Sequence, residues 1–93
     1  MPLTQRIYFN AVLQKNNRIT VPKLMRWQFK MEADQTLRVG IMLQIPFSGK
    51  QYFYAKMSKD GRILIPLLTL MLISREEKPA LAGNIFEITL EPA

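Results

Sequence analysis

The chain has 93 residues, enough for one domain with a hydrophobic core. It contains no cysteine and no histidine, which excludes disulfides, thiolate metal sites and histidine-based catalysis. The net charge is +6, and the excess lies in residues 1–46, which carry seven basic and two acidic side chains, whereas residues 47–93 carry six and five. A basic half predicts a polyanionic partner such as a nucleic acid or an anionic membrane. The alternative is that the charge only keeps a small domain soluble.

The first eight residues contain no apolar segment of the kind found in secretory signals. The longest apolar stretch, residues 63–73, includes Pro66 and Thr69. It is far shorter than the ~20 residues that a membrane-spanning helix needs. We therefore expect a cytoplasmic protein with no membrane partner.

A first repeat unit is predicted over residues 7–43, beginning with a strand. Apolar and polar residues alternate over residues 7–13, the period of a half-buried strand. Asn16 and Asn17 then have the composition of a tight type I′ hairpin turn, because Asn tolerates left-handed backbone angles. A short return strand follows over residues 19–21.

Pro22 ends the return strand and suits the first turn of a helix, which is predicted over residues 23–31. Its apolar residues have helical spacing and are interpreted as its core face, with base stacking by the tryptophan as the alternative: Leu24, Trp27 and Met31. An alternating strand over residues 37–43 completes the unit.

The second unit, residues 52–91, repeats the first one 44 positions later, after a linker at residues 44–51. Residues 8–11 read Tyr-Phe-Asn-Ala and recur as Tyr-Phe-Tyr-Ala. The turn and the following Ile-x-Val-Pro recur as Asp-Gly-Arg-Ile-Leu-Ile-Pro. A fixed period of this size is typical of one supersecondary unit used twice. We therefore expect residues 1–93 to form a single domain, mainly β with short helices, in which neither unit buries its apolar face alone.

The tyrosines of the first strand of each unit are predicted to face away from the core, as stacking platforms or as oligomer contacts: Tyr8, Tyr52 and Tyr54.

The second helix differs from the first in being apolar on every side. Leucines replace the basic and polar residues of the first helix and predict a surface that joins chains into a homo-oligomer, a dimer or larger: Leu67, Leu70 and Leu72. The alternative is that the connection over residues 74–83 covers this helix within one chain.

The motif formed by residues 60–66, Asp-Gly-Arg-Ile-Leu-Ile-Pro, resembles the swapped-hairpin domains of the AbrB/SpoVT/MazE type. The first unit matches the same motif with Asn17 in place of glycine. Two units in one chain are similar to the arrangement in MraZ-type proteins. The resemblance implies a β-barrel of two interleaved hairpins and a transcription regulator that binds double-stranded DNA.

The resemblance also implies the residues that contact DNA. They are an arginine after each hairpin turn, Arg18 and Arg62, and basic residues at the start of the first helix, Lys23 and Arg26. Lys15 and Lys59, which flank the turns and also repeat, are further candidates. Cationic side chains of this kind neutralise phosphates, and arginine can also read guanine edges. The alternative for each of these basic residues is that it is a solvated surface side chain without a DNA contact.

Two other function classes stay open. One is an antitoxin, which is the weaker alternative because the chain ends at Ala93, directly after the last predicted strand, without the acidic tail that wraps a toxin. The other is an interaction or assembly protein that uses the apolar second helix. An enzyme is not expected, because the sequence contains no nucleophile motif, phosphate-binding loop or metal-ligand cluster. Neither a cofactor nor a metal is expected.

Overall fold

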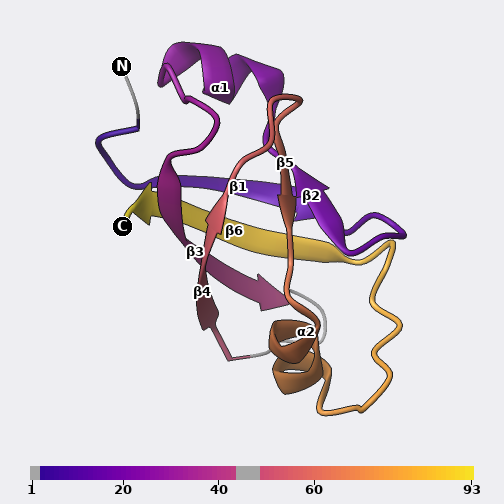
Figure 1. The fold of residues 1–93 in the computed structure, drawn as a ribbon. Coiled ribbons are helices and arrows are strands. Elements are labelled where there is room, and N and C mark those ends of the chain that lie inside the picture. The colour runs from indigo at the N-terminus through magenta and orange to yellow at the C-terminus, as the bar shows by residue number, and fades with distance from the viewer. Residues whose placement is uncertain (1–2, 44–48) are drawn as a thin grey trace.

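The computed structural model describes residues 3–43 and 49–93, and the two halves of the chain have the same order of elements (Figure 1). The first half contains β1 (Ile7–Val12), β2 (Arg18–Thr20), α1 (Lys23–Gln28) and β3 (Thr36–Leu43). The second half contains β4 (Gln51–Lys56), β5 (Arg62–Leu64), α2 (Leu67–Ser74) and β6 (Ile85–Pro92). The molecule is therefore mainly β with two short helices, as the sequence predicts.

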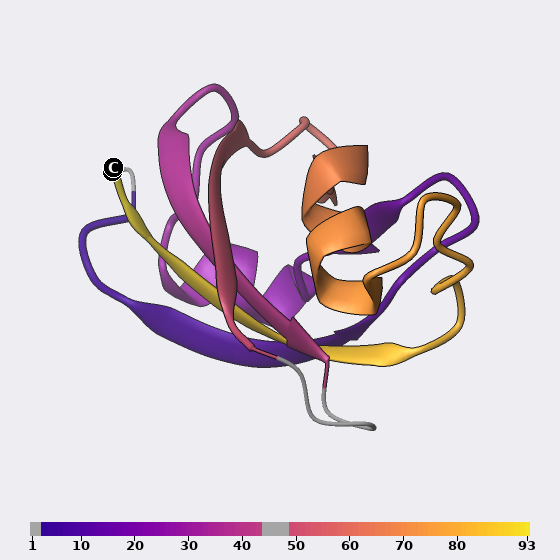
Figure 2. The same ribbon diagram turned by 90° about the horizontal axis from the view of Figure 1, so that it is seen from below.

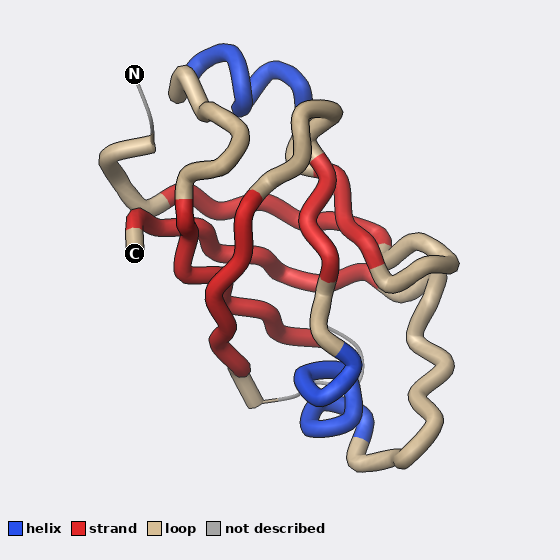
Figure 3. The backbone as a smooth tube through the Cα atoms, viewed as in Figure 1, coloured by secondary structure: helices blue, strands red, loops and turns tan. Residues whose placement is uncertain are grey.

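The strands of the described residues form two antiparallel sheets. One has four strands in the order β1-β6-β3-β4, and the other is a two-stranded ribbon of β2 and β5. The ribbon crosses over one face of the larger sheet (Figure 3), and α2 lies on the concave side of that curved sheet (Figure 2). The core lies between the two sheets, where fully buried side chains of the ribbon meet those of the central strands: Ile19, Ile63, Val39, Ile41, Phe86, Ile88 and Leu90.

The strand register relates the two halves by an approximate twofold axis. In the ribbon, Ile19 pairs with Ile63, its own equivalent 44 positions later. In the larger sheet β1 pairs with β6 as β4 pairs with β3. Two equivalent backbone hydrogen bonds, each 2.8 Å long, extend the ribbon at both ends, from Val21 N to Gly61 O and from Ile65 N to Asn17 O. Each half therefore completes its hydrogen bonding with strands of the other half.

The two hairpin turns are three-residue loops, so the predicted type I′ geometry is wrong. Asn17 N donates to Gln14 O (3.0 Å) and Gln14 N donates to Arg18 O (2.9 Å). Within the turn only Asn17 has a positive φ, 61°, and in the second turn only Gly61 does, 82°. A type I turn followed by one left-handed residue has this form. This turn joins β1 and β2, which do not pair with each other after it, because β2 pairs with β5.

The first helix buries a different face from the predicted one. Met25 and Phe29 pack against the core, whereas Trp27 and Leu24 are 80% and 77% exposed. The interpretation of Trp27 and Leu24 as core residues was therefore wrong; of that predicted face, only Met31 packs against the core. Helical spacing identifies a face but does not show which face the rest of the molecule covers, and here the core lies against the side of Met25.

The predicted linker, residues 44–51, overlaps residues 44–48, which lie outside the described part of the chain. Gln51 belongs to β4, which pairs directly with β3. The connection from α2 to β6 does not cover α2. It runs to the end of β1, where Gly83 N donates to Leu13 O (2.8 Å) and Leu13 N donates to Asn84 O (3.0 Å). None of the helices in the described residues is long and apolar enough to cross a membrane.

Candidate nucleic-acid interface

The ribbon presents both predicted turn arginines on its outward face. Because Ile19 and Ile63 point into the core, the residues on either side of them point to solvent. Arg18 lies opposite Leu64, and Arg62 lies opposite Thr20. The two arginines are therefore diagonal neighbours, with Cα atoms about 7 to 8 Å apart. The sequence repeat placed each arginine after a turn, and the tertiary structure brings them onto one surface.

The carboxylate of Asp60, in the second turn, partly neutralises the positive charge of Arg62. Ser58 Oγ donates a hydrogen bond to the Asp60 carboxylate, and Arg62 Nε lies 3.4 Å from Asp60 Oδ2. The Ser58 hydrogen bond, then a backbone hydrogen bond, and after it the charges of Arg62 and Arg18 hold the pKa of Asp60 below its ordinary value. Asp60 is therefore ionised at neutral pH. The equivalent residue of the first turn is Asn16, so Lys15 and Arg18 have no carboxylate within their own turn.

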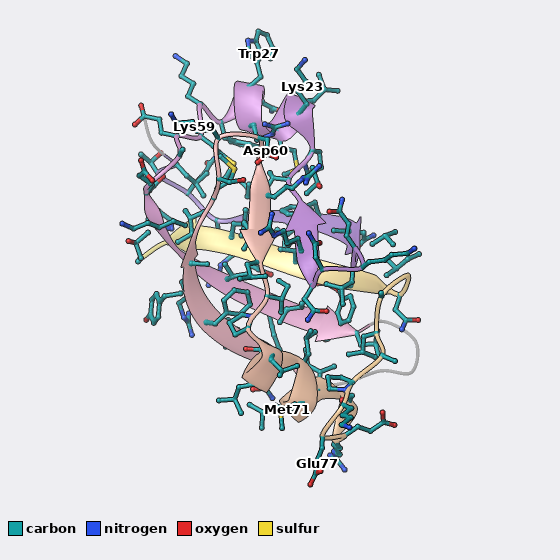
Figure 4. The ribbon with its side chains drawn as sticks, turned by 45° about the vertical axis from the view of Figure 1, so that its right-hand side comes forward. Lys23, Trp27, Lys59, Asp60, Met71 and Glu77 are labelled. Carbon is teal, nitrogen blue, oxygen red and sulfur yellow. The ribbon has the colours of Figure 1, made fainter. Side chains whose placement is uncertain are left out.

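The basic first helix lies beside the turn of the other half. Arg26 Nε donates to the Val21 carbonyl oxygen (3.1 Å), and its guanidinium packs over Gly61. A Cβ at Gly61 would lie 2.5 Å from Arg26 Nε, so only glycine leaves room for this contact. Figure 4 shows Lys23, Trp27, Lys59 and Asp60 together at this end of the molecule.

We call this region the basic end and define it by four predicted residues, two from each half: Lys23, Arg26, Lys59 and Arg62. Lys15 belongs to the first turn, at the opposite end of the ribbon. There the equivalent of the basic helix is the apolar α2. The predicted DNA-contacting residues thus divide into a cluster of four at one end, Arg18 on the ribbon and Lys15 at the far end.

The predicted association surface is only partly exposed. Leu67 and Leu72 are each 54% exposed, but Leu70 is 1% exposed and belongs to the core. The prediction was therefore wrong for Leu70, which points inward because it lies on the side of α2 that faces the sheet. Leu68, at 65% exposed, takes its place and joins Leu67 and Leu72 in an uncharged patch, called here the α2 patch.

The tyrosines lie on the face of the large sheet that points away from the core, as the alternation predicts. Tyr52 is engaged there, because the Arg38 guanidinium stacks 3.9 Å from the centroid of its ring. Arg38 also forms a 2.7 Å ion pair with Glu91, which is paired with Arg6 at 3.1 Å. The hydrogen bonds from Arg38 and Arg6 hold the pKa of Glu91 below its ordinary value. These contacts connect β3, β4, β6 and Arg6, directly before β1, across the outer face of the sheet.

Sequence analysis missed a pocket at the end of α1. It has a volume of about 570 Å³ and is lined by Arg26, Trp27, Gln28, Lys30, Met31 and Glu32. It was missed because Trp27 was placed in the core. A second pocket, of about 590 Å³, lies between the end of β1 and the connection to β6.

No protein-family model and no curated protein matches the chain. The fold is similar to that of a solved structure, the solution structure of PHS018 from Pyrococcus horikoshii, with a TM-score of 0.72. The alignment covers 99% of this chain and 94% of that protein, at 21% sequence identity. At that identity the likeness concerns the fold: a small, mainly β architecture that extends over essentially the whole chain.

Proposed function

We propose that the protein binds double-stranded DNA through the outward face of the β2–β5 ribbon and acts as a transcription regulator. The observation that carries this proposal is the position of Arg18 and Arg62, which lie as diagonal neighbours on an exposed two-stranded ribbon. The major groove of B-DNA admits a two-stranded β-ribbon, and arginine forms bidentate contacts with guanine there. The lysines of the two turns lie at the ends of this ribbon, where phosphates would flank the groove.

The reciprocal pairing of the two halves also supports a swapped-hairpin, AbrB-type body within one chain. In this proposal each half replaces one subunit of a dimer. The supporting observation is the matched register, in which Ile19 pairs with Ile63 and Gly40 pairs with its equivalent Thr89 on the central strands. Closure of the strands into a barrel belongs to the same proposal.

The charge distribution predicts that DNA contacts are unequal at the two ends of the ribbon. The basic end places Lys23 and Arg26 beside the second turn. The other end has Leu67 and Leu70 at the equivalent helix positions. A single chain is therefore expected to contact more phosphates on one side of its site than on the other, unlike a symmetric homodimer.

The test compares two double variants of equal charge. Arg18→Ala with Arg62→Ala removes the ribbon arginines, and Lys56→Ala with Lys78→Ala removes two exposed lysines that belong to neither strand of the ribbon. We expect the first variant to lower affinity for duplex DNA at least tenfold, because two charge-assisted contacts are lost. The second should stay within about threefold of the wild type. Equal affinity of the folded arginine variant and the wild type would reject the proposed surface.

A second candidate function, association between two copies, is favoured by the α2 patch. Leu67, Leu68 and Leu72 are uncovered although the connection that follows them is ten residues long. We propose a second copy of this chain as the partner, because α2 carries no charge that would have to be desolvated, and because the same three leucines on two copies are complementary to each other. This candidate is compatible with DNA binding, since the basic end stays free.

A further inference from the structure

The pocket at the end of α1 has an aromatic wall that no described residue covers. Trp27 is 80% exposed, and the pocket beside it measures about 570 Å³, within the range of small-ligand sites. An indole this exposed offers a large, rigid apolar ring face to a partner. Trp27 is also the one tryptophan of the sequence.

The chemistry of the pocket lining fits a nucleotide. Trp27 offers a ring face on which a base can stack, and Met31 adds an apolar, polarisable contact. The Gln28 amide can both donate to and accept from a base edge. Arg26 and Lys30 supply positive charge for a phosphate, against the single carboxylate of Glu32.

Lys30 is held at the pocket by an unusual backbone conformation. Its φ is 51°, in the left-handed region, and it ends α1 with two hydrogen bonds, Lys30 N to Trp27 O (3.3 Å) and Met31 N to Arg26 O (2.9 Å). Glycine normally occupies this position at a helix end because it has no Cβ penalty. A lysine here is disfavoured for folding, and backbone strain of this kind is common at ligand sites.

The pocket is continuous with the proposed DNA surface. Arg26 lines the pocket and also packs over Gly61 in the second turn. A strand that contacts the basic end therefore passes directly beside Trp27. This continuity and the cationic rim favour a nucleic acid over an apolar partner as the occupant.

We propose that the pocket binds one unpaired nucleotide of a DNA strand, with its base stacked on Trp27 and its phosphate at Lys30 and Arg26. This inference depends on the proposed function and names a preferred substrate, duplex DNA that contains an unpaired or easily extruded base. Extrusion costs least where a base is already unpaired.

The test uses Trp27 as its own fluorescent reporter. The probes are a perfect duplex, the same duplex with one bulged thymine, single-stranded oligo(dT), and free thymidine monophosphate. We expect the bulged duplex and oligo(dT) to quench the emission strongly and the perfect duplex to bind with little quenching. Quenching by the monophosphate at the same concentrations as the oligonucleotide would contradict the assignment to a strand.

The affinities of variants for a labelled bulged duplex then distinguish the loss of base stacking from a loss of folding. Trp27→Ala should bind about 5- to 150-fold more weakly, the effect of losing one base–aromatic stack, whereas Trp27→Phe should stay near the wild type. Leu24→Ala is the matched control, because Leu24 is equally exposed but does not line the pocket. Lys30→Gly should raise the urea midpoint of unfolding and still weaken binding, which a purely structural role would not produce.

Unchanged affinity in Trp27→Ala, or duplex binding without any quenching by the bulged duplex, would overturn the pocket assignment and leave the proposed function standing. The proposed function fails separately if the wild type binds oligo(dT) but not the perfect duplex.

Discussion

Gly61 and Asn17 occupy equivalent positions in the two turns. The missing side chain of Gly61 leaves the space in which the Arg26 guanidinium lies. Both have a positive φ, 82° and 61°. At Gly61 the Arg26 guanidinium packs on the backbone and occupies the space that a Cβ would take. The glycine thus serves both the turn and the link between α1 and the second turn.

Gly61→Ala should therefore reduce both stability and DNA affinity. We expect a loss of about 1 to 2 kcal/mol in the free energy of unfolding, because an alanine at this φ is strained. Affinity should also fall, because Arg26 would be displaced from the basic end. Asn17→Gly is the matched control and should change stability by about 0.5 kcal/mol or less, with affinity retained. Urea unfolding and DNA titration measure the two effects. A Gly61→Ala variant with wild-type affinity would show that the position of Arg26 does not matter for binding.

The two helices have the same place in the order of elements of each half but opposite surface chemistry. Both begin directly after a proline that follows a ribbon strand. Lys23 at the start of α1 is equivalent to Leu67 at the start of α2, and both are exposed. Replacing the lysine by leucine at one position, and the leucine by lysine at the other, therefore tests how much each end of the ribbon contributes to DNA binding.

Lys23→Leu should reduce the slope of log affinity against log salt by about 0.9, the amount expected for one lost phosphate contact. Leu67→Lys should increase the slope by a similar amount, because it adds a cation at the equivalent place on the other end. DNA titrations at several salt concentrations measure both. If neither substitution changes the slope, the helix starts do not contact the phosphates, and the contact surface is restricted to the ribbon and turns.

At the scale of the whole molecule, the approximate twofold axis is preserved in the strands and lost on the surface. The described chain measures 39 by 21 by 20 Å, with the basic end and the α2 patch toward opposite ends (Figure 4). Pairing of two chains through the α2 patch would leave a basic end exposed on each. Such a dimer would have a true twofold axis and suit a palindromic site.

Leu68→Lys with Leu72→Gln should therefore convert a dimer to a monomer without unfolding the chain. Both leucines are exposed, whereas Leu70 is buried, so a charge at Leu70 would disrupt the core instead. Burying exposed leucines contributes roughly 1.5 to 3 kcal/mol each, which is lost in the variant. Light scattering at micromolar concentration checks the mass, and circular dichroism checks the fold. A wild type that is monomeric at high micromolar concentration contradicts this pairing.

The strands, the faces they bury and the repeat could all be predicted from the order of the residues. Period-two alternation places Ile19 and Ile63 inward, and therefore Arg18 and Arg62 outward, because neighbouring side chains of a strand point to opposite faces. The proline and turn residues mark the ends of the short ribbon strands. These are local properties, which the order of residues encodes directly.

Which elements contact one another could not be predicted from the sequence and follows from the three-dimensional fold. The pairing of β2 with β5 brings Arg26 to Gly61, 35 positions away, and no local pattern specifies that crossing. The same holds for burial, since helical spacing predicted Trp27 on the core face of α1, whereas Met25 and Phe29 pack against the core and Trp27 is left in solvent. Leu70 is buried and Leu68 exposed for the same reason. Burial depends on what packs over a side chain, and that is a property of the whole fold.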